Sequence, residues 1–206
     1  MGLLMTRLPK IEISIFEAIL SRRSVRRYKA RQIGQETIRI LLEAAVRAPT
    51  AAHQEPWGFV VIQDKETLKR LSDKAKPLFI NEAEQTLVDH PVHMLDIFKQ
   101  PDFNIFYNAS TLILICGKTT APFYIADCWL AAENLMLAAS AMGLGTCVIG
   151  SALPALALAE AKAELSIPTS FTVVAPIVVG YPDDEITPVT RKKPVILANI
   201  GTTLNS

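Results

Sequence analysis

Residues 123–150 read FYIADCWLAAENLMLAASAMGLGTCVIG, an apolar helical stretch that runs into a short apolar strand. Apolar residues and alanines occupy nearly every side of a helix over 123–142. This pattern is typical of a helix buried in a core or at an interface. The glycines of residues 143–145 predict the end of this helix, and residues 147–150 are predicted to form a strand. A long buried helix that packs on a sheet is the first expectation.

Helices and strands alternate on both sides of this stretch. Helices are predicted over 14–19, 36–48, 65–76 and 155–165, and strands over 59–62, 111–116 and 171–180. The alternation predicts a small sheet covered by helices on both faces. Residues 81–107 have irregular periodicity and two prolines, which predicts a mobile segment that is helical only in parts; a plain core segment is the alternative.

The composition excludes several classes of protein. Of the 206 residues, 50% are apolar, and 21 Lys and Arg against 20 Asp and Glu leave a net charge of +1. A charge this small argues against nucleic acid and anionic membranes as partners. The mean hydropathy of +0.28 is high, yet no uncharged apolar run reaches the roughly 20 residues of a membrane span. An oligomer with an apolar interface fits better, and no membrane association is expected.

The reactive side chains form no recognisable catalytic or metal site. Cys116, Cys128 and Cys147 lie in apolar runs without a CxxC pair, so reduced thiols and a cytoplasmic location are expected. His90 and His93 are spaced as a pair of metal ligands. Pro91 interrupts that turn and no cluster of acidic residues or cysteines accompanies it, so no metal is expected. Nucleophile-elbow and Walker motifs are also absent from the sequence.

Two segments carry chemistry. Residues 22–26 read RRSVR, and with Arg27 they place four arginines and a hydroxyl within six residues, a donor set suited to phosphate. A solvated basic loop is the alternative. Residues 48–57 read APTAAHQEPW, a loop whose prolines fix the backbone and whose small residues would let the backbone approach a flat ring. An ordinary rigid connection is the alternative here.

These two segments, taken with the helix and glycines of 127–145, VAPIVVGYP at 174–182 and RKKP at 191–194, resemble the nitroreductase family of flavin enzymes. The resemblance covers about residues 14–197. It implies an α+β fold with a central mixed, mostly antiparallel sheet, helices on both faces and an intertwined homodimer. A single domain spans 1–206, with 182–206 as a C-terminal arm.

The resemblance also implies noncovalent FMN at the subunit interface. Three groups of residues match the family's flavin contacts. Those near the phosphate, the ribityl chain and the pyrimidine edge are Arg22, Arg23, Ser24, Arg26, Arg191, Lys192 and Lys193. Those of the loop contributed by the other subunit are Pro49, Thr50, Ala51 and His53. Those beneath the flavin N5 edge are Val148, Ile149, Gly150 and Ser151. Asn104 is the nearest polar counterpart of a family lysine at the flavin edge. The family's counterpart of residues 81–107 covers the open face of the flavin, so the resemblance implies that this segment is a mobile lid whose aromatic side chains contact acceptors.

The implied reaction takes hydride from NADH or NADPH and reduces nitroaromatic, quinone or similar small-molecule acceptors by a ping-pong mechanism. The FMN carries the chemistry, so no catalytic side chain is assigned. Two alternatives stay open: a specialised flavin reaction such as dehalogenation, azoline oxidation or flavin breakdown, and a flavin-binding protein without turnover. His53 and Glu55 depart from the Asn and Gln that are more common in the family, which affects the expected redox tuning and substrate.

Overall fold

The computed structural model describes residues 13–86, 95–184 and 189–201. His90 and His93, at which no metal is expected, and the middle of the expected lid lie outside these described residues. All statements below concern the described part of the chain.

Four strands form one sheet at the centre of the fold. They are β1 (Trp57–Ile62), β2 (Thr111–Lys118), β3 (Gly145–Val148) and β4 (Phe171–Gly180), in the order β1-β2-β4-β3. Each neighbouring pair is antiparallel, and the parallel pairing among the described residues is an isolated bridge between Ser24 and Thr146. The α+β fold with a mostly antiparallel sheet is therefore confirmed.

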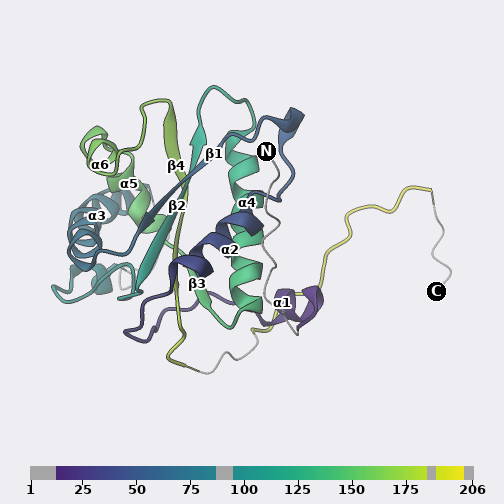
Figure 1. The fold of residues 1–206 in the computed structure, drawn as a ribbon, viewed down its shortest axis with the longest axis horizontal. Helices are drawn as coiled ribbons and strands as arrows, with labels where there is room; N and C mark the ends of the chain where they lie inside the picture. The colour runs from purple at the N-terminus through teal and green to yellow at the C-terminus, as the bar shows by residue number, and fades with distance from the viewer. Residues whose placement is uncertain (1–12, 87–94, 185–188, 202–206) are drawn as a thin grey trace.

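Helices cover both faces of this sheet (Figure 1). They are α1 (Ile15–Ser21), α2 (Gln35–Ala45), α3 (Lys65–Thr86), α4 (Tyr124–Ala141), α5 (Leu153–Leu156) and α6 (Ala159–Glu164), and the short 3₁₀ turns described are η1 (Ala51–His53), η3 (Asp96–Lys99) and η4 (Gly150–Ala152). The helices α2 and α4 pack on one face, and α3 and α5 pack on the other. The two-faced arrangement predicted from the alternation is confirmed.

The alternation of side chains along β2 divides the interior into two cores. Ile113 and Ile115 point to the core beneath α2 and α4, whereas Leu112 and Leu114 point to the core beneath α3 and α5. All four are fully buried. A strand buried on both faces has no polar side, so the sequence of β2 is a continuous apolar run rather than an alternating one.

Several predicted boundaries were wrong. The helix expected over 36–48 ends at Ala45, and the strand expected over 147–150 is Gly145–Val148. The helix expected over 65–76 continues through Pro77 to Thr86, because Leu78 packs on the core and the Phe79 ring contacts Phe98 at 4.8 Å between centroids. The helix expected over 155–165 is two short helices, since residues 157 and 158 are not helical. Of the three residues expected to end the long helix, Gly143 has the left-handed φ of +72° typical of such an end, whereas Gly145 begins β3.

The expected lid is in part a core segment. Phe106 is only 1% exposed and packs in the core beneath α3, so it does not contact substrates as the lid prediction required. Phe98, Phe103 and Tyr107 are half-buried. The Phe103 ring contacts both the Phe98 ring and the Tyr107 ring, each edge to face. A poor helical period misled the sequence reading here, because turns as well as helices can bury aromatic side chains.

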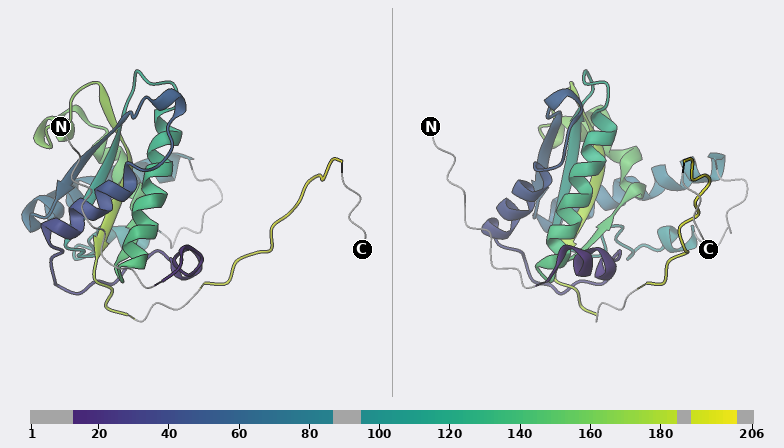
Figure 2. Two further views of the ribbon diagram at one scale, coloured as in Figure 1. Left: turned by 45° about the vertical axis from the view of Figure 1, so that its right-hand side comes forward. Right: turned by 90° about the vertical axis from the view of Figure 1, so that its right-hand side faces the viewer.

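Large apolar side chains are exposed on two helices that contact each other, α1 and α4. On α1 and α4 they include Phe16, Leu20, Ile125, Trp129 and Leu130. A C-terminal arm, residues 189–201, leads away from the body of the chain and exposes Val195, Ile196, Leu197 and Ile200 (Figure 2). Within the described ranges, no helix combines the length and the hydropathy needed to cross a bilayer.

Candidate functional site

The basic segment, residues 22–27, lies extended against the edge of the sheet. Ser24 bridges to Thr146 of β3, and the Val25 backbone N–H donates to the Thr146 carbonyl at 2.9 Å. Val25 is buried, whereas Ser24 and Arg26 are exposed. Successive side chains of an extended chain point to opposite sides, so Ser24 and Arg26 share the side that faces solvent.

Two glycines that pair across β3 and β4 allow this close approach. Gly145 and Gly180 are register partners. A Cβ on Gly145 would lie 2.8 Å from the Val25 side chain, and a Cβ on Gly180 would lie 2.9 Å from the Tyr28 ring. Both distances are too short for real carbon atoms, so the absence of side chains at this pair lets the basic segment lie against the sheet.

Arg22 and Arg23 lie beside the C-terminal half of α4. They line a small hollow together with Ser140 and Thr146. The Arg22 Nε atom is 3.8 Å from Glu133 Oε1, which is an ion pair longer than a hydrogen bond. The Arg22 guanidinium can therefore exchange this partner for a stronger bidentate contact with a phosphate.

A cavity of about 290 Å³ continues the site from Arg26. Asn104 and Tyr107 line it from the segment that precedes β2, and the Arg26 guanidinium lies 5.9 Å from the centre of the Tyr107 ring. The Asn104 side-chain oxygen accepts the Phe106 backbone N–H at 2.8 Å. This bond fixes the amide so that its nitrogen is the group offered to a ligand. The structure thus brings together Arg26 and Asn104, which are 78 positions apart in the sequence.

A larger cavity of about 650 Å³ lies between α3 and residues 101–110. It shares Asp102, Phe103, Asn104 and Asn108 with the smaller cavity, but its lining contains none of the four arginines of the basic segment. The smaller cavity is therefore the better candidate for an anionic or electron-rich ligand, despite its size.

Residues 148–151 leave β3 just beyond Thr146, the partner of Ser24. The Ile149 backbone N–H donates to the Pro176 carbonyl at 2.8 Å, which fixes the exit of the strand. Gly150 is exposed, and a Cβ built on it would meet nothing within 4 Å. The predicted backbone strip is thus open to solvent at Gly150, on the edge of the sheet that carries the basic segment, whereas the Ile149 side chain is buried.

The loop with Pro49, Thr50, Ala51 and His53 lies at the opposite end of α4 from the basic segment (Figure 1). Asp127, in the first turn of α4, accepts the Ala51 backbone N–H at 3.1 Å. A helix of 18 residues spans about 27 Å. One chain therefore does not place this loop and the basic segment around a single ligand.

The predicted tail cations are also separate from the basic segment within one chain. Arg191, Lys192 and Lys193 are exposed on the arm that leads away from the body (Figure 2). The structure thus divides the predicted residues into three groups: the basic segment with the cavity and the β3 exit, the loop at the far end of α4, and the arm.

Two ionisable side chains at the site, Tyr28 and Cys147, stay protonated because they are largely buried. Burial raises the pKa of the Tyr28 phenol, whose hydroxyl donates to the Val25 carbonyl at 2.7 Å. Burial likewise raises the pKa of the Cys147 thiol. Both groups support the basic segment and neither is an acid at neutral pH. No three metal-ligating side chains cluster in the part of the chain that the structure describes.

Sequence reasoning missed three contributors to these groups, and it placed a fourth, Tyr107, among the aromatic residues of the lid rather than beside Arg26. Tyr28 and Tyr107 flank Arg26, while Glu133 and Asp127 project from α4 toward the basic segment and the far loop. The acidic pair carried a signal, because a carboxylate is unusual in a helix that is apolar on most sides. The tyrosines carried none, since their partners are distant in sequence.

Comparison with known proteins identifies the class. The sequence profile described as "Nitroreductase family" matches residues 19–181. The chain belongs to the nitroreductase family, which confirms the resemblance drawn from the motifs.

Individual relatives support this assignment. A protein of Archaeoglobus fulgidus, named provisionally as an NADH dehydrogenase/NAD(P)H nitroreductase, is 31% identical over 81% of this chain and 84% of its own length. An iodotyrosine deiodinase of Thermotoga neapolitana is 24% identical over 82% of this chain and 89% of its own. The crystal structure of a nitroreductase with bound FMN from Bacteroides fragilis is 26% identical, with a TM-score of 0.72 over 93% of this chain and 99% of that one.

Proposed function

We propose that this protein binds FMN, takes hydride from NADH or NADPH, and reduces a nitroaromatic, quinone or similar small acceptor as a homodimer. The observation that carries the proposal is the position of Ser24 and Arg26 on one solvent-facing side, beside a cavity that Asn104 also lines. Membership of the nitroreductase family supports it.

The donor set fits FMN along its whole length. Arg22, Arg23 and Ser24 offer guanidinium and hydroxyl donors to a phosphate. Arg26 and Asn104 offer a cation and an amide to the polar edge of a flavin, next to the cavity of about 290 Å³. No residue of the described site would need an unusual charge state to bind this ligand.

A second copy of the chain would complete the site. The loop of residues 49–53 and the basic segment lie at opposite ends of α4, so a partner packed across α4 could bring its loop to this chain's basic segment. The exposed apolar side chains Ile125, Trp129 and Leu130 supply such a contact face on α4. The exposed cations of the arm, residues 191–193, would reach the phosphate from the same assembly.

Bound FMN supplies hydride and electron transfer, and the chain supplies binding and charge. Arg26 places a positive charge at the polar edge, where it would stabilise negative charge that develops on reduction. The absence of a second nucleotide-binding domain in the described fold means that reductant and acceptor share one open face. Ping-pong kinetics follow, because the first product must leave before the second substrate binds.

The proposal is tested on purified protein reconstituted with FMN. Anaerobic mixing with NADH, and separately with NADPH, should bleach the flavin absorption, and a nitroaromatic or quinone should restore it. A protein that binds FMN but is bleached by neither nucleotide would contradict the oxidoreductase proposal in favour of a binding protein. We place this reaction in the cytoplasm, because the three cysteines are free and buried.

Reductive dehalogenation is a second candidate, favoured by the similarity to the Thermotoga neapolitana iodotyrosine deiodinase. The same reduced protein, mixed with 3-iodotyrosine in place of the nitroaromatic, distinguishes the two. Release of iodide at a rate that exceeds nitroaromatic reduction would favour dehalogenation. Reoxidation by the nitroaromatic alone would favour the first proposal.

A further inference from the structure

We propose that Lys76 and Ser72 of α3 are positioning residues that hold the strap, residues 100–107, so that Asn104 and Tyr107 face Arg26 across the cavity. The inference rests on the proposed FMN site, and it assigns a role to two residues outside that site. Neither side chain touches the cavity of about 290 Å³.

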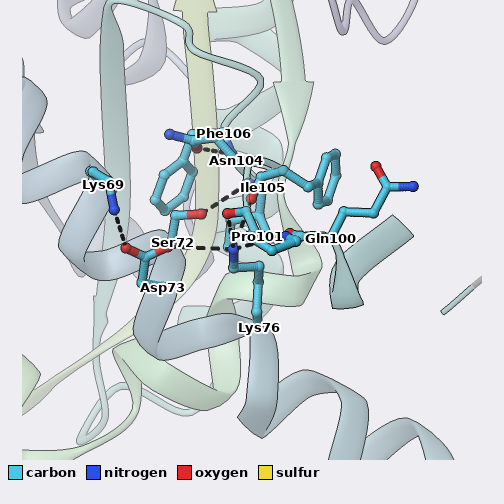
Figure 3. Close-up of polar contacts among 10 residues, drawn as sticks. Lys69, Ser72, Asp73, Lys76, Gln100, Pro101, Asn104, Ile105 and Phe106 are labelled. Atoms are coloured by element: carbon cyan, nitrogen blue, oxygen red, sulfur yellow. Dashed lines mark hydrogen bonds and ion pairs between the residues drawn. The ribbon is translucent and has the colours of Figure 1, made fainter. Parts of the chain in front are cut away.

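Lys76 binds the strap through its backbone (Figure 3). Its ammonium group donates to the carbonyls of Phe103 at 3.0 Å, Pro101 at 3.2 Å and Gln100 at 3.5 Å. Asp73 Oδ1 lies 3.4 Å from the same nitrogen, and the Lys76 side chain is only 11% exposed. A nearly buried ammonium is costly unless its three hydrogens and its charge are satisfied. Here the strap carbonyls and Asp73 satisfy both.

Ser72 fixes the strap one step further along. The Ser72 hydroxyl, which is buried, accepts the Ile105 backbone N–H at 3.0 Å. The next residue, Phe106, is buried in the core beneath α3. Asn104 therefore lies between a carbonyl held by Lys76 and an N–H held by Ser72, as Figure 3 shows.

The strap then turns back at Tyr107 and Asn108. Both residues have a φ of +54°, in the left-handed region that side-chain-bearing residues seldom adopt. This turn directs Tyr107 toward Arg26, where the ring and the guanidinium meet at 5.9 Å. A shift of the strap would thus move the amide and the ring at the cavity together, without changing any residue of the cavity itself.

The test compares Lys76→Met with Lys69→Met. Lys69 lies two turns earlier on α3 and pairs with the same Asp73 at 2.6 Å, but it contacts no strap carbonyl among the described residues and is 68% exposed. Lys69→Met therefore removes the same charge from the same helix and breaks an ion pair with the same aspartate, which makes it a matched control. FMN dissociation constants, flavin absorption spectra and anaerobic rates of reduction by NADH are measured on both dimers, with melting temperatures alongside.

We expect Lys76→Met to weaken FMN binding by about tenfold or more and to shift the flavin spectrum, because small displacements of positioning groups are costly. Lys69→Met should stay within about twofold of wild type, as for exposed ion pairs. If Lys76→Met equals Lys69→Met in affinity and spectrum, whatever its melting temperature, the positioning role is overturned and Lys76 only stabilises the fold.

Ser72→Ala decides the question if Lys76→Met does not fold. It removes one acceptor and should reproduce the spectral shift; an unchanged spectrum and affinity would overturn the proposal. If the wild-type protein bound no FMN, the proposed function would fail. Amide hydrogen exchange of residues 103–109 in the FMN-free protein then tests separately whether Lys76 holds the strap. Faster exchange in Lys76→Met than in the wild type would support this role, and equal exchange would overturn it.

Discussion

Arg22 illustrates how a single side chain can be kept ready for a ligand. Its guanidinium is anchored near Glu133 of α4 at 3.8 Å, and its side chain remains 23% exposed. This ion pair already restricts the conformations of the free side chain. Fewer conformations would therefore be lost when a phosphate binds, which lowers the entropic cost of binding. The pair itself stabilises the fold little, because exposed ion pairs are worth about 0–1 kcal/mol.

Arg22→Ala should weaken FMN much more than riboflavin, which lacks the phosphate. A charged contact is worth about 2 kcal/mol, which corresponds to a roughly thirtyfold loss in FMN affinity. Titration with both ligands, followed by flavin fluorescence, measures the difference. Arg70→Ala, which removes an exposed arginine paired with Glu164 on α3, is the control and should change neither affinity. Equal losses for both ligands would show that Arg22 does not bind the phosphate.

Asp127, at the other end of α4, holds the loop of residues 49–53 by a hydrogen bond to its backbone. Its Oδ1 atom accepts the Ala51 N–H, while its buried Oδ2 atom has no hydrogen-bond partner among the described residues. The loop that it holds contains three residues with left-handed φ, namely Ala52, His53 and Glu55. Such a backbone persists only where surrounding contacts enforce it.

Asp127→Ala should therefore destabilise the fold by about 1–3 kcal/mol, since the Ala51 N–H loses its acceptor. Asp127→Asn should cost less, because its amide oxygen can still accept that bond and no buried charge is left. Urea unfolding of the three proteins measures both values. A loss for Asp127→Asn as large as that for Asp127→Ala would mean that the charge, not the hydrogen bond, holds the loop.

At the scale of elements, the pairing of Gly145 with Gly180 decides where the basic segment lies. The two strands present no side chain at this point, so Val25 and Tyr28 lie directly on the sheet. Four arginines and Ser24 thereby follow the edge of a rigid sheet rather than a free loop. Sites on strands hold their geometry better than sites on loops.

Gly145→Ala should displace the basic segment, because the new methyl group would lie 2.8 Å from Val25. Overpacking of this kind costs about 1–3 kcal/mol, and we expect FMN affinity to fall together with thermal stability. Gly34→Ser is the control: its Cβ meets nothing within 4 Å, and serine is favoured at the N-cap of α2 that it occupies. Unchanged FMN affinity in Gly145→Ala would indicate that the segment binds FMN from another position.

At the scale of the whole molecule, both cores enclose thiols. Cys116 and Cys147 lie in the core beneath α3, and Cys128 lies in the core beneath α4. Burial raises the pKa of Cys116 from 9.0 to about 11 and that of Cys128 from 9.0 to about 12. Both thiols are therefore protonated in the folded chain at any pH near neutrality.

The pH dependence of stability follows from these raised pKa values. Below pH 9.0, the pKa assigned to an unperturbed thiol, each thiol is neutral in both states and its burial is unopposed. As the pH rises above that value, the unfolded chain ionises first, so the free energy of unfolding should fall between pH 9 and the folded pKa values. Urea unfolding at pH 8 and pH 10 measures the fall, and Cys116→Ser or Cys128→Ser should reduce it. Constant stability across this range would contradict the buried-thiol assignment.

The exposed side of α4 sets the expected state of assembly. Light scattering of the FMN-bound protein should give the mass of two chains, and Leu130→Glu should shift it toward one chain with loss of FMN. Leu158→Glu is the matched control, because Leu158 is similarly exposed, 37% against 46%, and lies between α5 and α6 on the other side of the sheet. A wild-type protein that binds FMN as a single chain would exclude the dimer proposal.

Local patterns in the sequence were enough to predict the class of protein and most of its helices and strands. Continuous apolar runs predicted β2 and β4, and the apolar stretch over 123–142 predicted α4 to within a residue at each end. These patterns are local, because burial on both faces demands apolar side chains at every position. The arginines of residues 22–27 predicted an anion site from their donor chemistry alone, and this site stays a prediction.

Which of these residues lie close together in space became known only from the folded structure. It brought Arg26 to Asn104 and Tyr107, and it separated the loop of residues 49–53 from the basic segment by the length of α4. It also buried Phe106 and extended α3 through Pro77, because contacts with distant residues outweigh local propensity. Contacts between residues far apart in sequence leave no periodic signal in the sequence. The contacts between Lys76 and the strap could therefore be found only in the folded structure.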